Sequence, residues 1–211
     1  MKKRMLSILM MLVLAMSLVA CGEDNNRTSD EVTTQDSANQ DAGEDVQEDT
    51  SADAADAVSI LADVWAVYGE NDKFYGMGGD ANNMVENAPG AFSLEDKDAL
   101  AATLLVQADA AGMIDEAASL VHGMNLNIFT GGAYHLTDAA NMQAFADAMK
   151  NSILNNQWMC GSPDQYVIYS VNGEYAVVAF GAVDVMNVFK QNFTSVHGEN
   201  AEVVVEGNVA Q

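Results

Sequence analysis

Two β-rich segments joined through an asparagine–glycine pair constrain the fold of this chain more than any other feature. Residues 166–171 and 175–180 are rich in β-branched and aromatic side chains, and Asn172-Gly173-Glu174 separates them. Asparagine and glycine both tolerate the positive φ angles that a type I′ turn requires. The pattern therefore predicts an antiparallel hairpin over residues 166–180.

Strand-like and helical segments flank this hairpin. Residues 126–136 form a strand-like run that Gly131-Gly132 interrupts, and Asp138 can cap a helix after it. The expected buried stripe of that helix is Met142, Phe145, Met149 and Ile153. A second helix is expected from Asp184, and a strand over 201–205 follows it. The expected inward residues of this second helix are Val185, Val188, Phe189, Asn192 and Val196.

Read in order, these segments give β-α-β-β-α-β, the order of a ferredoxin-like α+β sandwich. In that arrangement both crossover helices cover one face of an antiparallel sheet. Helices nearer the N-terminus would cover an edge or the open face. A different α+β arrangement, in which the stretch near residue 131 is not a strand, remains an alternative.

The segment 57–125 is less regular but also suggests helices. Helical spacing of apolar residues predicts a helix over 57–68, which Gly69 would end. Ser93, with Asp96 three residues later, resembles an N-capping pair for a helix reaching about residue 106. A short helix is expected over 114–122. Residues 57–211 are thus expected to form a single domain.

The N-terminal 20 residues have the layout of a secretory signal. Lys2, Lys3 and Arg4 precede an uncharged apolar segment over residues 5–20, which ends in small residues. This segment is shorter than the roughly 20 apolar residues that span a bilayer. A retained N-terminal membrane helix is the less favoured alternative.

Leu18-Val19-Ala20-Cys21 resembles the lipobox of bacterial lipoproteins. The resemblance implies that residues 1–20 are removed and that Cys21 carries a diacylglyceryl group. The protein would then be held by lipid on the outer face of the cytoplasmic membrane. Two acyl chains are sufficient for stable anchoring, so no spanning helix is required.

Residues 21–56 are acidic, polar and free of aromatic side chains. Low hydrophobicity combined with high net charge is typical of disorder, so this segment is expected to be an extended tether. Removal of the signal would leave five basic residues against 31 acidic ones, a net charge of −26. Such a charge disfavours nucleic acid and anionic lipid, whereas cations, cationic peptides and basic protein surfaces remain permitted partners.

Cys160 is the other cysteine, so lipidation of Cys21 would exclude an intramolecular disulfide. The sequence Trp158-Met159-Cys160-Gly161-Ser162-Pro163 is similar to the neighbourhood of a thioredoxin-type centre. However, Pro163 stands where the second thiol of a CxxC pair would be. A buried structural cysteine is the favoured interpretation; a single reactive thiol and an intermolecular disulfide are the alternatives.

No other motif defines an enzyme or a cofactor site. The sequence contains no G-x-S-x-G, P-loop or dinucleotide fingerprint, and no metal site is expected from His122, His135 and His197 because their spacing is wrong. Oxygen-bearing side chains in the loop 69–87 suit calcium, but such residues also occur in ordinary loops. The eight methionines after the signal suit either core filling or an adaptable binding groove, and core filling is favoured.

Three segments carry a resemblance to a family: residues 83–92 (NMVENAPGAF), 117–136 (AASLVHGMNLNIFTGGAYHL) and 155–168 (NNQWMCGSPDQYVI). They resemble lipoproteins of anaerobic Firmicutes labelled bacteriocin transport accessory protein. The resemblance implies help with peptide export and names no catalytic residue. The better-defined accessory proteins of that name are thioredoxin-like with a CxxC pair, which this chain lacks.

The leading hypothesis is therefore a non-enzymatic, lipid-anchored surface protein that binds a protein, peptide or small ligand. The alternatives are a thiol-dependent accessory factor that uses Cys160 and a purely structural lipoprotein. No cofactor is expected for the leading function.

Overall fold

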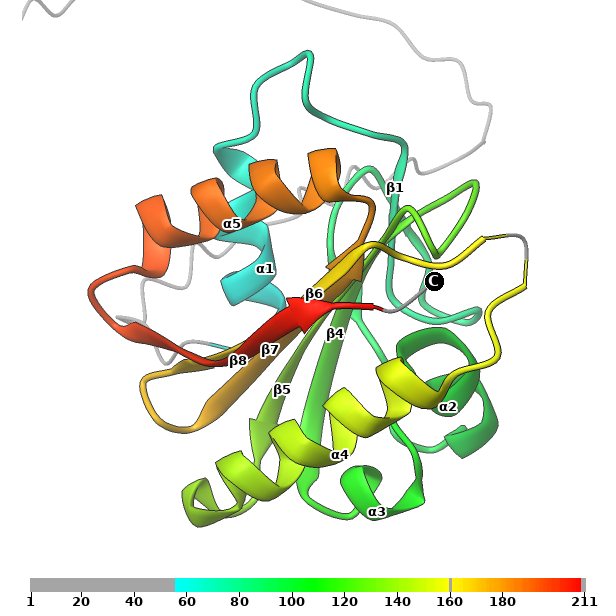
Figure 1. The fold of residues 1–211 in the computed structure, drawn as a ribbon, viewed down its shortest axis with the longest axis vertical. Coiled ribbons are helices and arrows are strands. Elements are labelled where there is room, and N and C mark those ends of the chain that lie inside the picture. Colours follow the sequence, from blue (N-terminus) through cyan, green and yellow to red (C-terminus); the bar gives the residue numbers. More distant parts are fainter. Residues whose placement is uncertain (1–55, 160, 210–211) are drawn as a thin grey trace, which may run out of the picture. The chain divides into compact units, whose positions relative to one another are not determined.

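An eight-stranded antiparallel sheet organises the chain (Figure 1). The structure is a computed structural model, and it describes residues 56–159 and 161–209. Seven strands follow the order β2-β1-β4-β5-β7-β6-β8, and β3 also pairs with β4. The strands are β1 (Gly76–Gly78), β2 (Val85–Glu86), β3 (Gly90–Ala91), β4 (Ile114–His122), β5 (Phe129–Leu136), β6 (Gln165–Val171), β7 (Tyr175–Gly181) and β8 (Ala201–Asn208). The helices are α1 (Ala57–Ala66), α2 (Lys97–Leu104), α3 (Ala108–Ala111), the 3-10 helix η1 (Ala139–Asn141), α4 (Met142–Asn155) and α5 (Val183–His197).

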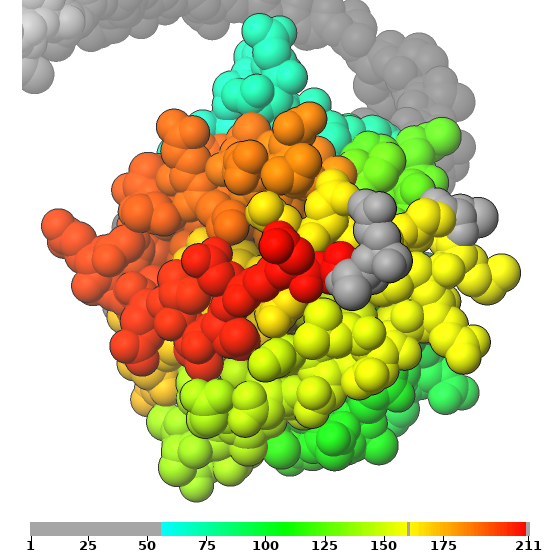
Figure 2. All heavy atoms as spheres, in the orientation of Figure 1, coloured from blue at the N-terminus to red at the C-terminus, as the bar shows by residue number. Residues whose placement is uncertain are grey.

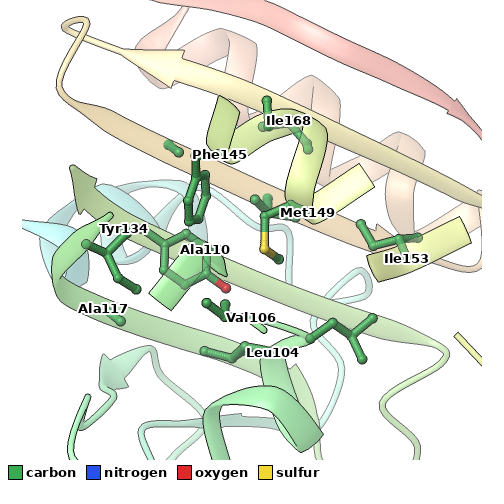
Figure 3. Packing of buried hydrophobic residues seen from close by; sticks show 14 of the residues in the cluster. Leu104, Val106, Ala110, Ala117, Tyr134, Phe145, Met149, Ile153 and Ile168 are labelled. Atoms are coloured by element: carbon green, nitrogen blue, oxygen red, sulfur yellow. The ribbon is translucent and has the colours of Figure 1, made fainter. Parts of the chain in front are cut away.

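Helices cover both faces of this sheet. α1 and α5 lie on one face, whereas α2, α3 and α4 lie on the other (Figure 1). Successive strand residues point to opposite faces. In β6, Val167 therefore joins the core under α1 and α5, and Ile168 joins the core under α4. Figure 3 shows the second core, in which Phe145 and Met149 of α4 lie against the sheet.

The α+β class and several local predictions are confirmed. The hairpin β6–β7 has Asn172 at φ 53° and Gly173 at φ 78°, the positive angles that its turn requires. The stretch containing Gly131-Gly132 is strand β5, which rules out the alternative arrangement in which it is not a strand. Helix α4 buries Phe145, Met149 and Ile153 as the spacing predicts, whereas Met142, also expected in this stripe, is only partly buried.

The helix expected over 114–122 is wrong, because these residues form β4. Ala117 and Val121 belong to one core, and Ala118 and Leu120 belong to the other. A strand buried on both faces is apolar at successive positions, so the period-two alternation disappears from its sequence. Small apolar residues at such positions match a helical spacing equally well.

The expected placement of both crossover helices on one face is also wrong. The elements β5-α4-β6-β7-α5-β8 do occur in the expected order, but β8 pairs with β6 rather than with β5. β4 pairs with β5 in its place. Because β5 and β7 run in opposite directions and both crossovers proceed toward the β8 edge, right-handed connections place α4 and α5 on opposite faces. Figure 2 shows the result, with β8 at the surface between α5 and α4.

The beginning of α2 differs in detail from the expected capping pair. Asp96 is the N-cap, and its side chain accepts a hydrogen bond from the Ala99 backbone N–H at 2.9 Å. Ser93 instead accepts from the Glu95 backbone N–H. None of the helices within residues 56–159 and 161–209 is both long enough and apolar enough to span a membrane.

Candidate ligand groove

An apolar groove with a volume of about 430 Å³ lies at the end of the sheet where β4 finishes. Four segments build it: β1 with the loop that follows it, Phe92 just after β3, one side of α2, and the end of β4 with its connection to β5. The apolar side chains that line it are Met77, Met84, Phe92, Val121, Met124 and Leu126. We refer to this hollow as the methionine groove.

Two glycines let the backbone pass closely behind the groove. A Cβ atom on Gly78 would collide with the backbone of Ala88 and Gly90, so only glycine fits this crossing. Gly79 has φ 76°, and a Cβ atom there would meet the carbonyl oxygen of Asn83. The glycine-rich sequence at 76–79 therefore serves a close backbone approach.

The carboxylate of Asp80 holds the loop in place. It accepts hydrogen bonds from the backbone N–H groups of Asn82 at 2.7 Å, Ser93 at 2.8 Å and Asn83 at 3.2 Å. These bonds, led by the one from Ser93, lower the pKa of the Asp80 carboxyl below its ordinary value. Asp80 lines the groove and is only 8% exposed. Because its pKa is lowered, the groove wall contains an ionised carboxylate.

Side chains from the sheet and α1 fix the groove from beneath. Ser119 of β4 donates to the carbonyl oxygen of Gly79 at 3.1 Å. The indole N–H of Trp65 donates to the carbonyl oxygen of Asn87 at 2.7 Å. Both contacts join the loop to rigid elements, so the groove is largely preformed.

The floor and the rim of the groove differ in exposure. Phe92 and Val121 are buried and form the floor, whereas Met84 is 60% exposed and Met124 is 80% exposed. An apolar floor beneath two exposed thioether side chains can enclose another apolar group. Methionine suits this task because its unbranched, polarisable side chain adapts to different shapes.

The exposed methionines contradict the expectation that methionine fills the core of this protein. Met149 and Met186 are buried in the cores as expected, but Met84, Met124 and Met159 are largely exposed. A signal for the groove was present in the sequence, since Met84 and Met124 stand in Asn-rich and Gly-rich stretches without helical or strand periodicity. Nothing in those stretches showed that the two residues line the same groove.

The two cysteines singled out from the sequence, Cys21 and Cys160, both lie outside the described residues. The residues next to Cys160 are described: the side-chain amide of Asn127 donates to the carbonyl oxygens of Met159 at 2.9 Å and Gly161 at 2.6 Å. Met159 is 81% exposed. Asn127 thus ties this loop to the β4–β5 connection.

The three histidines lie in different places. His122 lines the methionine groove, and its Nδ1 accepts from the Met124 backbone N–H at 3.2 Å. His135 lies beside Asp115, and His197 donates to the Ile60 carbonyl oxygen at 3.0 Å. In the ranges 56–159 and 161–209, no three His, Cys, Asp or Glu side chains form a group that could hold a metal ion.

The hydrogen bonds of Asp80 give this residue a structural role in the loop 69–87, which was considered for calcium. Both of its carboxylate oxygens accept hydrogen bonds from N–H groups of the protein. Glu86 lies on β2 opposite Met77. The loop's best-placed acid therefore organises the groove wall.

Comparison of the chain with family models, with curated proteins and with solved structures finds no match.

Proposed function

We propose that this chain is a lipid-anchored, extracytoplasmic binding protein that takes an apolar side chain of a peptide ligand into the methionine groove. The observation that carries the proposal is the pairing of two exposed methionines, Met84 and Met124, with a buried apolar floor. Large exposed apolar side chains gathered around a preformed hollow are typical of ligand sites.

Other features support the same assignment. Lys2, Lys3 and Arg4 with the apolar segment that follows suit a secretory signal, and Cys21 suits a lipid anchor. The resemblance to bacteriocin transport accessory lipoproteins favours a peptide as the ligand and an accessory role in peptide export. No catalytic step is needed for such a role.

Methionine-methyl NMR tests the groove directly. The full-length chain, labelled with ¹³C at its methionine methyls and held in phosphatidylcholine nanodiscs, is titrated with the neutral peptide acetyl-Gly-Ser-Leu-Phe-Leu-Ser-Gly-amide. We expect the resonances of Met77, Met84 and Met124 to shift, with Met159 unchanged as an internal reference. Absence of any shift at the three groove methionines would overturn the proposal.

A matched pair of variants checks the site. Met84→Ser combined with Met124→Ser should weaken binding about thirtyfold, because partial burial of each side chain contributes on the order of 1 kcal/mol. Met159→Ser, a change at an equally exposed methionine outside the groove, should leave binding unchanged. Equal effects of the two changes would mean that the groove is not the site.

The thiol-dependent role is separated from this proposal by one substitution. Cys160→Ser should leave peptide binding intact if the groove is the ligand site. If Cys160 were the working group, the same change would abolish activity, and the native thiol would react at once with an alkylating reagent at neutral pH.

A further inference from the structure

The charge around the methionine groove narrows the class of ligand, given the proposed function. Residues 56–159 and 161–209 contain 20 acidic and four basic side chains, a net charge of −16. Two of the basic groups contact other side chains: Lys190 pairs with Glu206 at 3.1 Å, and Lys73 lies 5.7 Å from the centre of the Trp65 ring. The field that a ligand meets at this surface is therefore negative.

The groove itself carries negative charge and no Lys or Arg among its lining residues. Asp80 contributes an ionised carboxylate to the wall. Glu86 is exposed, and its Cα faces that of Met77 across the β1–β2 pair. Directly opposed residues of an antiparallel pair project on the same side of the sheet. An exposed carboxylate therefore stands next to an apolar lining residue.

The helix on the other side of the groove repeats this arrangement. Ala99 and Thr103 of α2 line the hollow, and Asp96 caps the same helix one turn before Ala99. Asp98 follows in the first turn of α2, where Lys97 is the one basic neighbour. Acidic residues thus lie on α2, which contributes Ala99 and Thr103 to the groove, and on β2, which pairs with the strand that carries Met77.

We infer that the ligand of the methionine groove is a cationic peptide, in which one or two apolar side chains enter the hollow and flanking Lys or Arg side chains meet Glu86 and the acidic start of α2. The volume of about 430 Å³ suits a short apolar stretch, since ligand pockets typically measure about 300–1,000 Å³. Complementary charge then supplies orientation and selectivity.

A set of peptides that differ only in their flanks tests this inference. The neutral peptide used above is compared with versions that carry Lys or Glu in place of its Ser residues. Binding is measured from the methyl shifts of Met77, Met84 and Met124 in the full-length chain, held in neutral phosphatidylcholine nanodiscs, with empty nanodiscs as the control. We expect about tenfold tighter binding of the Lys peptide than of the neutral one at low salt, and weaker binding of the Glu peptide.

High salt and charge-removing substitutions test where the preference for the Lys peptide arises. The advantage of the Lys peptide should nearly vanish at 1 M salt, where the screening length is about 3 Å. Glu86→Gln should reduce it, whereas Glu174→Gln should not, because Glu174 lies at the opposite end of β5, next to Leu136. Both variants retain the acidic segment 21–56, so any attraction to that segment is the same in each.

The outcomes separate this inference from the proposed function. If the neutral and Lys peptides bind equally at the groove methionines, the cationic class is wrong and the binding function stands. If the Lys peptide binds more tightly but Glu86→Gln has no effect, the charge lies elsewhere and the inference also fails. If no peptide shifts these methyls, both the inference and the proposed function are wrong.

Discussion

At the scale of single residues, Asp80 has the largest structural influence on the groove. Its carboxylate accepts hydrogen bonds from three backbone N–H groups, of which that of Asn83 also donates to the Asp80 carbonyl oxygen at 3.1 Å. From the sequence, the loop 69–87 that contains this residue suits calcium but is equally typical of an ordinary loop, because aspartate, asparagine and glycine serve both purposes. Only the fold shows that the donors come from the loop itself and from Ser93, 13 residues away.

Asp80→Ala should destabilise the protein by about 2–3 kcal/mol, because the part-buried backbone N–H groups of Asn82 and Ser93 lose the carboxylate that accepts from them. Urea unfolding measures the change, and Asp63→Ala, at an exposed position of α1, is the control. A loss no larger than that of the control would show that water replaces the carboxylate at no cost.

The same carboxylate predicts a pH dependence. Its pKa is lower in the folded protein than in the unfolded chain, so its stabilisation is fully present above the unfolded pKa of about 3.9 and is lost as the pH falls through the folded pKa. The difference in unfolding free energy between the native protein and Asp80→Ala should therefore shrink below about pH 4. A difference that stays constant down to pH 2 would contradict the assignment.

Two glycines with the same backbone conformation allow a clean comparison. Gly79 and Gly173 have φ angles of 76° and 78°, but a Cβ atom would collide with the Asn83 carbonyl only at Gly79. Gly173→Ala should cost about 1–2 kcal/mol, the usual penalty of the left-handed conformation. Gly79→Ala should cost clearly more and should also weaken peptide binding. Equal unfolding midpoints for the two variants would mean that the crossing behind the groove relaxes easily.

At the scale of elements, local signals were sufficient where the sequence carries strong turn chemistry, a run of β-branched and aromatic residues, or a 3.6-residue period. The β6–β7 hairpin and the stripe of α4 followed from such signals. β4 is buried on both faces, as β6 and β7 are, so it lacks the alternation that marks a half-exposed strand, and its alanines do not supply the β-branched and aromatic signal of that hairpin. The inward face of α5 also differs from the expected one. Met186 and Phe193 are buried together with the expected Phe189. Asn192 and Val196, which were expected to face inward, are only partly buried.

The observed inward face of α5, which differs from the expected one, leads to a prediction. Phe193 is 1% exposed and stacks on Tyr169 with ring centroids 4.0 Å apart. Phe193→Ala should destabilise the protein by about 3–5 kcal/mol, as removal of a buried aromatic side chain does. Val196→Ala should cost less than about 1 kcal/mol because this side chain is only half-buried. Urea unfolding distinguishes them, and the reverse order would restore the inward face expected from the sequence.

At the scale of the whole molecule, neither the strand order nor the methionine groove could be read from the sequence. Pairing of β8 with β6 and of β4 with β5 depends on contacts between distant segments, and no short motif encodes those choices. The groove is similarly assembled from residues near 80, 100 and 124. Its apolar character was visible in the sequence, but its existence was not.

The lipid anchor proposed at Cys21 predicts the molecular mass of the native protein and its location in the cell. Purified native protein should begin at Cys21 and carry the added mass of a diacylglyceryl group, and it should sediment with membranes. Cys21→Ser should lose the lipid mass and leave the peptide affinity of the groove unchanged. An intact Met1 terminus without lipid in the native protein would contradict the anchor.

The position of the groove along β4 separates the ligand site from the start of α1. The backbone N–H of Ala57, where α1 begins, donates to the Glu116 side chain at 3.0 Å, near the start of that strand. Val121 and His122, which line the groove, stand at its other end. Six residues of extended chain separate Glu116 from His122, about 20 Å. The groove therefore lies at the end of β4 remote from Ala57, so that one strand separates the residue where the helical part of the domain begins from the surface that meets a ligand.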